Sequence, residues 1–88
     1  MSPNNALLKF PTDYPIKVVG RKDSALRSRI DAIVQTHAPD VDQTRTVERP
    51  SGNGKFIAIS YIVVARSREQ VIALVTELAA CDGVVMVI

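Results

Sequence analysis

The sequence predicts an α+β fold of the ferredoxin-like type, a two-layer βαββαβ sandwich with a four-stranded antiparallel sheet and both helices on one face. Three observations predict it. Strand-like and helix-like segments follow one another in the order β-α-β-β-α-β, which is the order of the split βαβ unit. The 88 residues suffice for one two-layer core. Hydrophobic residues at 47% and charged residues at 23% are typical of a globular domain. We expect residues 10–88 to form a single domain and residues 1–9 a flexible tail.

The first strand and the first helix lie between breaker residues. The β-branched run at 16–20 ends at a glycine and predicts a strand. Asp23 or Ser24 can cap the helix that follows. The helix should end before Pro39, because proline disfavours helical geometry in the residue before it. Its apolar residues recur at helical spacing and predict a buried stripe of Leu26, Ile30, Ile33, Val34 and His37.

A β-hairpin is expected in the middle of the chain. Residues 41–49 contain β-branched side chains and too few apolar positions for a helical stripe, so we expect an edge strand. The run 50–54 is dense in turn-forming residues. It leads into residues 55–65, which form the longest β-type run of the chain. The two strands and the turn between them predict a hairpin.

The second helix and the last strand complete the order. The segment 67–70 is a capping-box pattern that opens a helix, and Asp82-Gly83 ends it. Residues 84–88 are all apolar and predict the last strand. The buried stripe expected on this helix consists of Val71, Leu74, Val75 and Leu78.

One face of the sheet is left without helices in this topology, because right-handed crossovers place both helices on the same side. The first and third strands are central and the other two are edges. On the third strand the odd residues 57–63 form an unbroken apolar set, so we assign them to the helix side. The even residues then lie on the uncovered side, which we call the open face. Its predicted interaction residues are Lys17, Val19, Phe56, Ile62, Val64 and Val85, with Val87 as an alternative to Val85.

A contiguous apolar patch on the open face predicts a protein partner or a second copy of the chain, since soluble monomers seldom expose such a patch. Two alternatives remain at this point. The N-terminal tail could fold over the patch, or the central strand could be apolar on both sides without any partner.

The turn after the first strand is a candidate ligand site. Backbone N–H groups at a helix N-terminus point outward there beside two cations, and this arrangement could hold a small anion or an amino acid. The alternative is a capped helix with solvated surface charges. The candidate residues are Gly20, Arg21, Lys22, Asp23, Ser24 and Leu26.

Several function classes are not expected. The net charge of +2 forms no basic block, and Ala58 stands where an RNA-recognition motif would need a stacking aromatic, so we expect no nucleic acid. Cys81 is the single cysteine and His37 the single histidine, and the fold puts them at opposite ends of antiparallel helices. We therefore expect no catalytic residue, no metal, no cofactor and no enzyme activity. A lone cysteine and the absence of a long apolar run suggest a cytoplasmic protein that neither is secreted nor spans a membrane.

A family resemblance rests on five segments in order and spacing: residues 10–12, 16–20, 37–39, 54–56 and 84–88. With these segments the chain resembles the YbeD-like family of small bacterial proteins, from about residue 7 to residue 88. The resemblance implies a ferredoxin-like fold similar to ACT regulatory domains, no established enzyme activity, and a connection with lipoate metabolism in the cytosol.

ACT domains bind amino acids at the turn after the first strand, typically through an aspartate followed closely by a Pro-Gly pair. This chain keeps Asp23 and Leu26 but has Ser24 and Ala25 near the place of that pair. The sequence therefore predicts first a regulatory or interaction module that acts through its sheet, by self-association or by docking to a cytosolic enzyme. The alternative is a small-molecule sensor of the ACT type.

Overall fold

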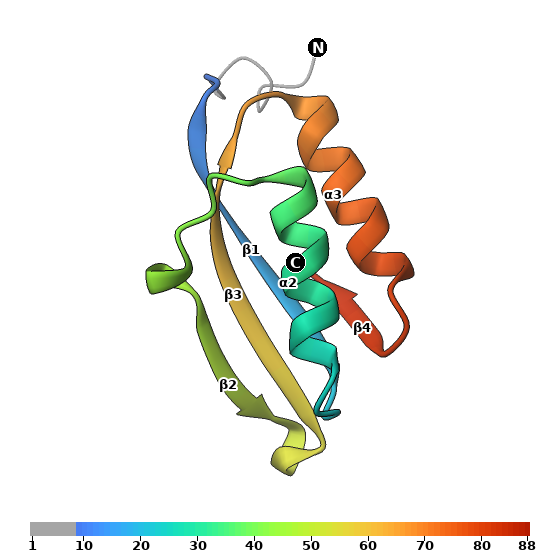
Figure 1. Ribbon diagram of the computed structural model, residues 1–88. Helices are drawn as coiled ribbons and strands as arrows, with labels where there is room; N and C mark the ends of the chain where they lie inside the picture. The colour runs from blue at the N-terminus through green and yellow to red at the C-terminus, as the bar shows by residue number, and fades with distance from the viewer. Residues whose placement is uncertain (1–8) are drawn as a thin grey trace.

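Two helices lie side by side in front of a four-stranded antiparallel sheet in the computed structural model, which describes residues 9–88 (Figure 1). The strand order is β2-β3-β1-β4, so the first and third strands are central, as predicted. The prediction for a tail at residues 1–9 lies outside the described residues, except at Lys9. The elements are β1 (Thr12–Arg21), α2 (Leu26–His37), β2 (Val47–Ser51), β3 (Phe56–Ala65), α3 (Arg68–Ala80) and β4 (Val84–Val87).

The central strands β1 and β3 pair along their whole length, from Thr12 opposite Ala65 to Arg21 opposite Phe56. Successive side chains of a strand point to opposite faces, and burial on β3 alternates accordingly. The odd residues of β3 are buried beneath the helices, which confirms their predicted side; they are Ile57, Ile59, Tyr61, Val63 and Ala65. The even residues are partly exposed on the open face.

The helices bury the predicted stripes. On α2 the residues Leu26, Ile30 and Val34 are fully buried, and Ile33 is partly buried against the core. On α3 the buried residues are Leu74 and Leu78. The capping box is present in part, because the Ser67 hydroxyl accepts a hydrogen bond of 3.1 Å from the backbone N–H of Gln70. The two helices run antiparallel, as the topology requires (Figure 1).

Strand β1 is longer than predicted, because it starts at Thr12 instead of residue 16. Pro15 lies inside it, which is unusual for a central strand. The Lys17 N–H donates to the carbonyl of Ile88, so the odd residues of β1 direct their backbone groups toward β4. Pro15 lies beyond the end of β4, and its missing N–H therefore removes no hydrogen bond from the ladder.

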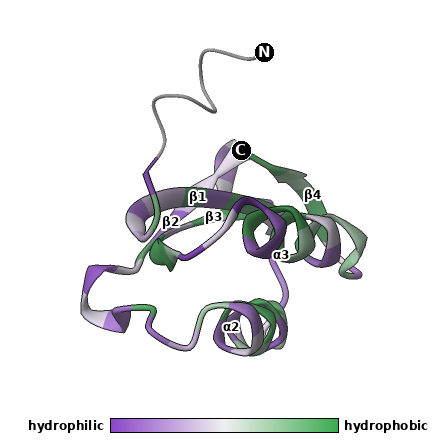
Figure 2. Ribbon diagram, turned by 90° about the horizontal axis from the view of Figure 1, so that it is seen from above, coloured by the Kyte–Doolittle hydropathy of each residue, from purple (hydrophilic) through white to green (hydrophobic). Residues whose placement is uncertain are grey.

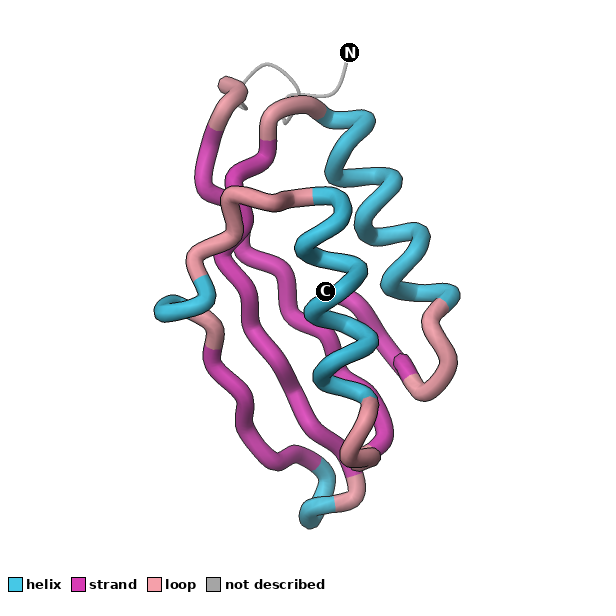
Figure 3. The backbone as a smooth tube through the Cα atoms, viewed as in Figure 1, coloured by secondary structure: helices cyan, strands magenta, loops and turns pink. Residues whose placement is uncertain are grey.

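The predicted strand over 41–49 is wrong in its first half. A 3-10 turn at Gln43–Arg45 precedes β2, which starts only at Val47. The carboxylate of Asp42 accepts hydrogen bonds from the backbone N–H and the hydroxyl of Thr44, and these local bonds favour a turn over a strand. A second turn, Gly52–Gly54, joins β2 to β3, so one short helical turn lies on each side of β2 (Figure 3).

Gly20 allows β1, β4 and the start of α2 to approach closely. A Cβ atom at this position would lie 2.5 Å from Cδ2 of Leu26 and 2.9 Å from the carbonyl oxygen of Gly83. Gly83 has φ of +93°, a left-handed conformation that favours glycine. These two glycines bring the α3–β4 turn against the first strand-to-helix turn.

Candidate functional site

The open face is built from residues of all four strands, which lie opposite one another in rows. One row runs from Met86 through Val19 and Ala58 to Arg49, and directly paired residues share a face of the sheet. A second row contains Arg21, Phe56 and Ser51, and a third contains Lys17, Ser60 and Val47. At the other end of β3, Ile62 lies opposite Pro15 and Val64 opposite Asp13.

Strand β4 adds apolar side chains that the sequence analysis missed. The predicted alternative Val87 is wrong, because Val87 packs against the core. The pairing shifts between Val19 and Gly20, so that Val85 has no partner on β1. Such a bulge reverses which residues point to a given face, and it cannot be recognised in an uninterrupted apolar run. Met86 and Ile88, which pair with Val19 and Lys17, have exposed fractions of 49% and 67%.

Apolar colour covers the length of β4 (Figure 2). Next to this strand a shallow groove of about 320 Å³ opens on the face between β1, β3 and the chain end. Its lining includes Pro15, Lys17, Ser60, Ile62 and Ile88. The predicted interaction residues Lys17, Val19, Phe56, Ile62 and Val64 therefore do share one surface, with Val85 at its margin.

Charge is distributed unequally between the two sides of the sheet. On the helix side, Arg27 pairs with Asp31 and with Glu48 of β2. His37 pairs with Glu77 across the two helices. On the open face, Lys17, Arg21 and Arg49 are exposed and have no ion-pair partner within residues 9–88. The carboxylate at its margin, Asp13, pairs with Arg45.

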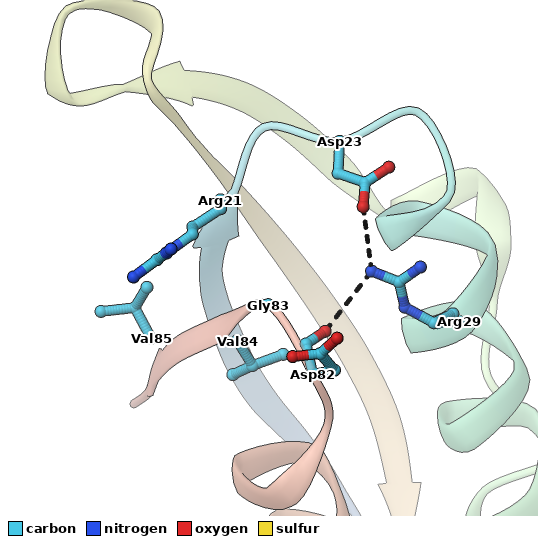
Figure 4. Close-up of a pocket in the computed structure, with 7 residues that line it drawn as sticks. All are labelled: Arg21, Asp23, Arg29, Asp82, Gly83, Val84 and Val85. Atoms are coloured by element: carbon cyan, nitrogen blue, oxygen red, sulfur yellow. Dashed lines mark hydrogen bonds and ion pairs between the residues drawn. The ribbon is translucent and has the colours of Figure 1, made fainter.

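A cavity of about 530 Å³ lies where the first strand-to-helix turn meets the α3–β4 turn (Figure 4). Two of the six predicted turn residues, Arg21 and Asp23, line it. The rest of the lining comes from parts of the chain that are distant in sequence: Arg29, Asp82, Gly83, Val84 and Val85. No local sequence pattern could have brought these residues together, because the α3–β4 turn reaches the site only through the tertiary fold.

The other predicted turn residues do not line the cavity. Leu26 is fully buried in the core and Gly20 is buried beneath it, so neither offers a side chain to a ligand. Lys22 and Ser24 are exposed outside the cavity. The Lys22 N–H donates to the carbonyl of Lys55.

The Asp23 carboxylate already accepts a backbone N–H at the start of α2. It accepts a hydrogen bond of 2.9 Å from the Ala25 N–H and one of 3.2 Å from the Arg29 guanidinium. The Ala25 N–H first, and Arg29 second, hold the pKa of Asp23 below its ordinary value. The position of the helix cap itself is occupied by Ala25. A free anion would therefore compete with the chain's own carboxylate at this helix N-terminus.

The two guanidinium groups of the cavity differ in their environment. Arg29 bridges Asp23 and the backbone carbonyl of Asp82, and the hydrogen bond to Asp23 raises its pKa. Arg21 extends instead toward Val85, away from Arg29 (Figure 4). Arg21 thus belongs to both the cavity and the open face, and Val85 lines the cavity at the margin of that face.

The remaining chemistry-bearing side chains line neither surface, although the Cys81 side chain lies near Arg29 of the cavity. His37 bonds to Glu77 at 2.6 Å through its Nε2 atom, so its side-chain partner lies on the other helix. Cys81 is a free, partly buried cysteine after α3. Over residues 9–88 no three His, Cys, Asp or Glu side chains gather as a metal cluster would require. No helix in this range has the length and hydropathy needed to cross a membrane.

Solved structures share this fold at low sequence identity. The C-terminal domain of the MgtC protein from Mycobacterium tuberculosis has a TM-score of 0.70 at 17% identity, covering 92% of this chain and 88% of that one. The ACT domain of GTP pyrophosphokinase from Chlorobium tepidum has a TM-score of 0.65 at 15% identity, covering 88% and 97%. These likenesses confirm the ferredoxin-like, ACT-like architecture.

Sequence relatives extend over nearly the whole chain. A UPF0250 protein of Ectopseudomonas mendocina is 37% identical over 82 residues, which cover 92% of this chain and 89% of the relative. A UPF0250 protein of Shewanella sediminis is 42% identical over 78 residues, covering 89% and 86%. These relatives and the ACT-like fold confirm the resemblance to the YbeD-like family. Residues 5–88 match the family described as "Protein of unknown function (DUF493)", and the chain belongs to that family.

Proposed function

We propose that the protein is a non-catalytic regulatory or interaction module of the cytosol, which acts through protein contacts of its sheet, by self-association or by docking to an enzyme. The observation that carries the proposal is the open face. Its central strand presents Phe56, Ile62 and Val64 partly exposed, and β4 adds the exposed Met86 and Ile88. Soluble monomers seldom expose large apolar patches, and where such patches occur they usually mark a contact with a partner.

The helix side supports the proposal by contrast. Most of its charged side chains form ion pairs within the chain, as Arg27 does with Asp31 and Glu48. A surface that satisfies its own charges has less to offer a partner than one that leaves apolar groups and cations exposed. The YbeD-like resemblance directs the search for the docked enzyme to lipoate metabolism.

The test compares two lysine substitutions that add the same charge on opposite sides of the molecule. Ile62 lies on the open face, and Ile72 is exposed on α3. We expect Ile62→Lys to lower the oligomer mass in sedimentation velocity, or to abolish capture of a partner by the tagged chain. Ile72→Lys should change neither. An unchanged dimer or an unchanged partner with Ile62→Lys would reject the open face as the contact surface.

A second candidate function is a small-molecule sensor at the first strand-to-helix turn. The observation that favours it is the cavity of about 530 Å³, which is lined by two guanidinium groups and two carboxylates. Such a lining is complementary to a zwitterion, since a ligand carboxylate can meet Arg21 while a ligand ammonium group meets Asp82.

Thermal unfolding in the presence of pooled amino acids and of lipoate tests the sensor. A ligand should raise the midpoint of the wild-type protein and leave that of Arg21→Ala unchanged. Lys22→Ala, which removes a neighbouring cation outside the cavity, is the control and should retain the ligand effect. The absence of any shift with every compound would reject the sensor.

A further inference from the structure

We propose that the partner of the open face is an acidic segment of another protein, in which carboxylates alternate with apolar side chains. The inference rests on the proposed function, since it names the occupant of the same surface. The physical basis is the distribution of the three cations Lys17, Arg21 and Arg49, each exposed and none of them paired with a carboxylate of residues 9–88.

These cations lie on both sides of the open-face residues of β3. Arg21 and Lys17 lie on β1, directly opposite Phe56 and Ser60. Arg49 lies on β2, opposite Ala58. A partner that rests apolar side chains on β3 between Phe56 and Ser60 therefore brings its flanking groups next to cations on either side. Carboxylates at these places form ion pairs, and they do so at the rim of the contact, where such pairs direct association and specificity.

The charge distribution argues against a second copy of this chain in face-to-face contact. A two-fold interface is made of the same patch on both partners. It would gather Lys17, Arg21 and Arg49 of both copies into one interface. The face supplies one carboxylate in compensation, Asp13, and this already pairs with Arg45. Like charges brought together across an interface disfavour the complex.

A nucleic acid would also be attracted by the cations, but the face is poorly suited to it. Proteins that bind single strands stack the bases on several aromatic side chains. Phe56 is the one aromatic residue of the strand positions that form the open face, and the positions around it are occupied by Ala58, Val19 and Ser51. The exposed aliphatic groups Met86 and Ile88 offer no stacking surface.

The experiment is an amide NMR titration of the full chain with two matched peptides. The acidic probe is acetyl-Glu-Leu-Glu-Val-Glu-Leu-Glu-amide, and the control probe has glutamine at every glutamate. We expect the acidic peptide to shift amide signals on β1 and β3, with an affinity that falls as salt is added. The glutamine peptide should bind on the order of tenfold more weakly, because it lacks the rim ion pairs.

Two double variants with the same change in charge locate the contact. Arg21→Glu/Arg49→Glu alters the open face and should lower the affinity for the acidic peptide by on the order of tenfold. Lys22→Glu/Arg68→Glu alters two exposed cations that lie off the face and should retain wild-type affinity. Dispersed spectra of both variants establish that they fold. Equal losses in the two variants would mean general electrostatic attraction and would overturn the proposal.

Other occupants give different results, each of which overturns it. Shifts on the face with a single-stranded oligonucleotide or with anionic vesicles, but not with the acidic peptide, would point to another class of ligand. Nuclear Overhauser contacts from residues 1–8 to Phe56 or Ile62 would assign the surface to the chain's own N-terminal segment. The absence of amide shifts with the acidic peptide at millimolar concentration would reject an acidic partner.

Sedimentation velocity on the same samples separates this inference from the function on which it rests. If the wild-type protein forms a dimer that Ile62→Lys dissociates, the open face is a contact surface but its occupant is a second copy, and only the inference fails. If none of self-association, partner capture and peptide binding involves the open face, both fail.

Discussion

The hydroxyl of Tyr61 donates a hydrogen bond of 2.5 Å to the carboxylate of Asp31, and this contact ties the centre of the sheet to the first helix. Tyr61 is fully buried on β3, whereas Asp31 is partly exposed on α2. Asp31 also accepts from Arg27, which in turn donates to Glu48 of β2. Three elements are thus joined through one chain of polar contacts on the helix side of the sheet.

Removal of the Tyr61 hydroxyl should destabilise the fold without disturbing the apolar packing. Tyr61→Phe keeps the ring and loses a hydrogen bond to a charged acceptor, so we expect the free energy of unfolding to fall by about 1–2 kcal/mol. Denaturant unfolding followed by circular dichroism measures it. In an Asp31→Asn background the same substitution should cost less, because the acceptor has lost its charge. Equal costs in the two backgrounds would show that the charge of Asp31 adds nothing to this hydrogen bond.

The ionisation of Tyr61 should be linked to unfolding in alkaline solution. Burial first, and the Asp31 carboxylate second, raise the pKa of Tyr61 well above its ordinary value. A group with a raised pKa in the folded state contributes stability below its unfolded pKa of about 10 and loses it as the pH rises further. In Tyr14→Phe, which leaves Tyr61 as the sole tyrosine, ultraviolet absorbance should therefore report ionisation together with loss of structure. Ionisation near pH 10 in a folded chain would contradict this.

Gly20→Ala should destabilise the protein by steric overlap. The added Cβ would approach Leu26 and the Gly83 carbonyl too closely, and overpacking of this kind costs about 1–3 kcal/mol. Thermal or denaturant unfolding gives the loss. The same change in a Leu26→Val background should cost less, because valine lacks the Cδ2 atom that the new methyl group meets. A cost that does not depend on residue 26 would exclude the overlap with Leu26 as the cause.

Acid should weaken the contacts of Asp23 and Asp42. Asp23 has a lowered pKa because of the Ala25 N–H and Arg29, and Asp42 because of the hydroxyl and the N–H of Thr44. A carboxylate with a lowered folded pKa contributes stability above its unfolded pKa near 3.9 and loses it as the pH falls through the folded value. The free energy of unfolding should therefore decrease on going from about pH 6 to about pH 3.

Asparagine substitutions assign that acid sensitivity. Asp23→Asn and Asp42→Asn keep an acceptor for the local hydrogen bonds but remove the titrating group, so each should reduce the change in unfolding free energy between the two pH values. Asp82→Asn is the control, because the Asp82 carboxylate makes no hydrogen bond to the described residues. A wild-type pH dependence in both substituted proteins would locate the acid-sensitive groups elsewhere.

The candidate sites were only partly predictable. Five open-face residues follow from side-chain alternation, since β1 and β3, which carry them, alternate regularly. Met86 and Ile88 were missed, because a bulge at Val85 depends on pairing with β1. Asp23 and Arg21 were found from the turn sequence, whereas Arg29 and Asp82 join them only across the folded chain.

The sequence by itself determined the order of the elements, the helical stripes and the side of β3 that faces the helices. These depend on short-range periodicity, which a chain carries in its own spacing of apolar groups. The tertiary structure alone decided the full length of β1, which is held by pairing with β3, and the juxtaposition of the two turns around Gly20 and Gly83. It also decided which open-face cations have no ion-pair partner among residues 9–88, because ion pairs join residues that no local pattern relates.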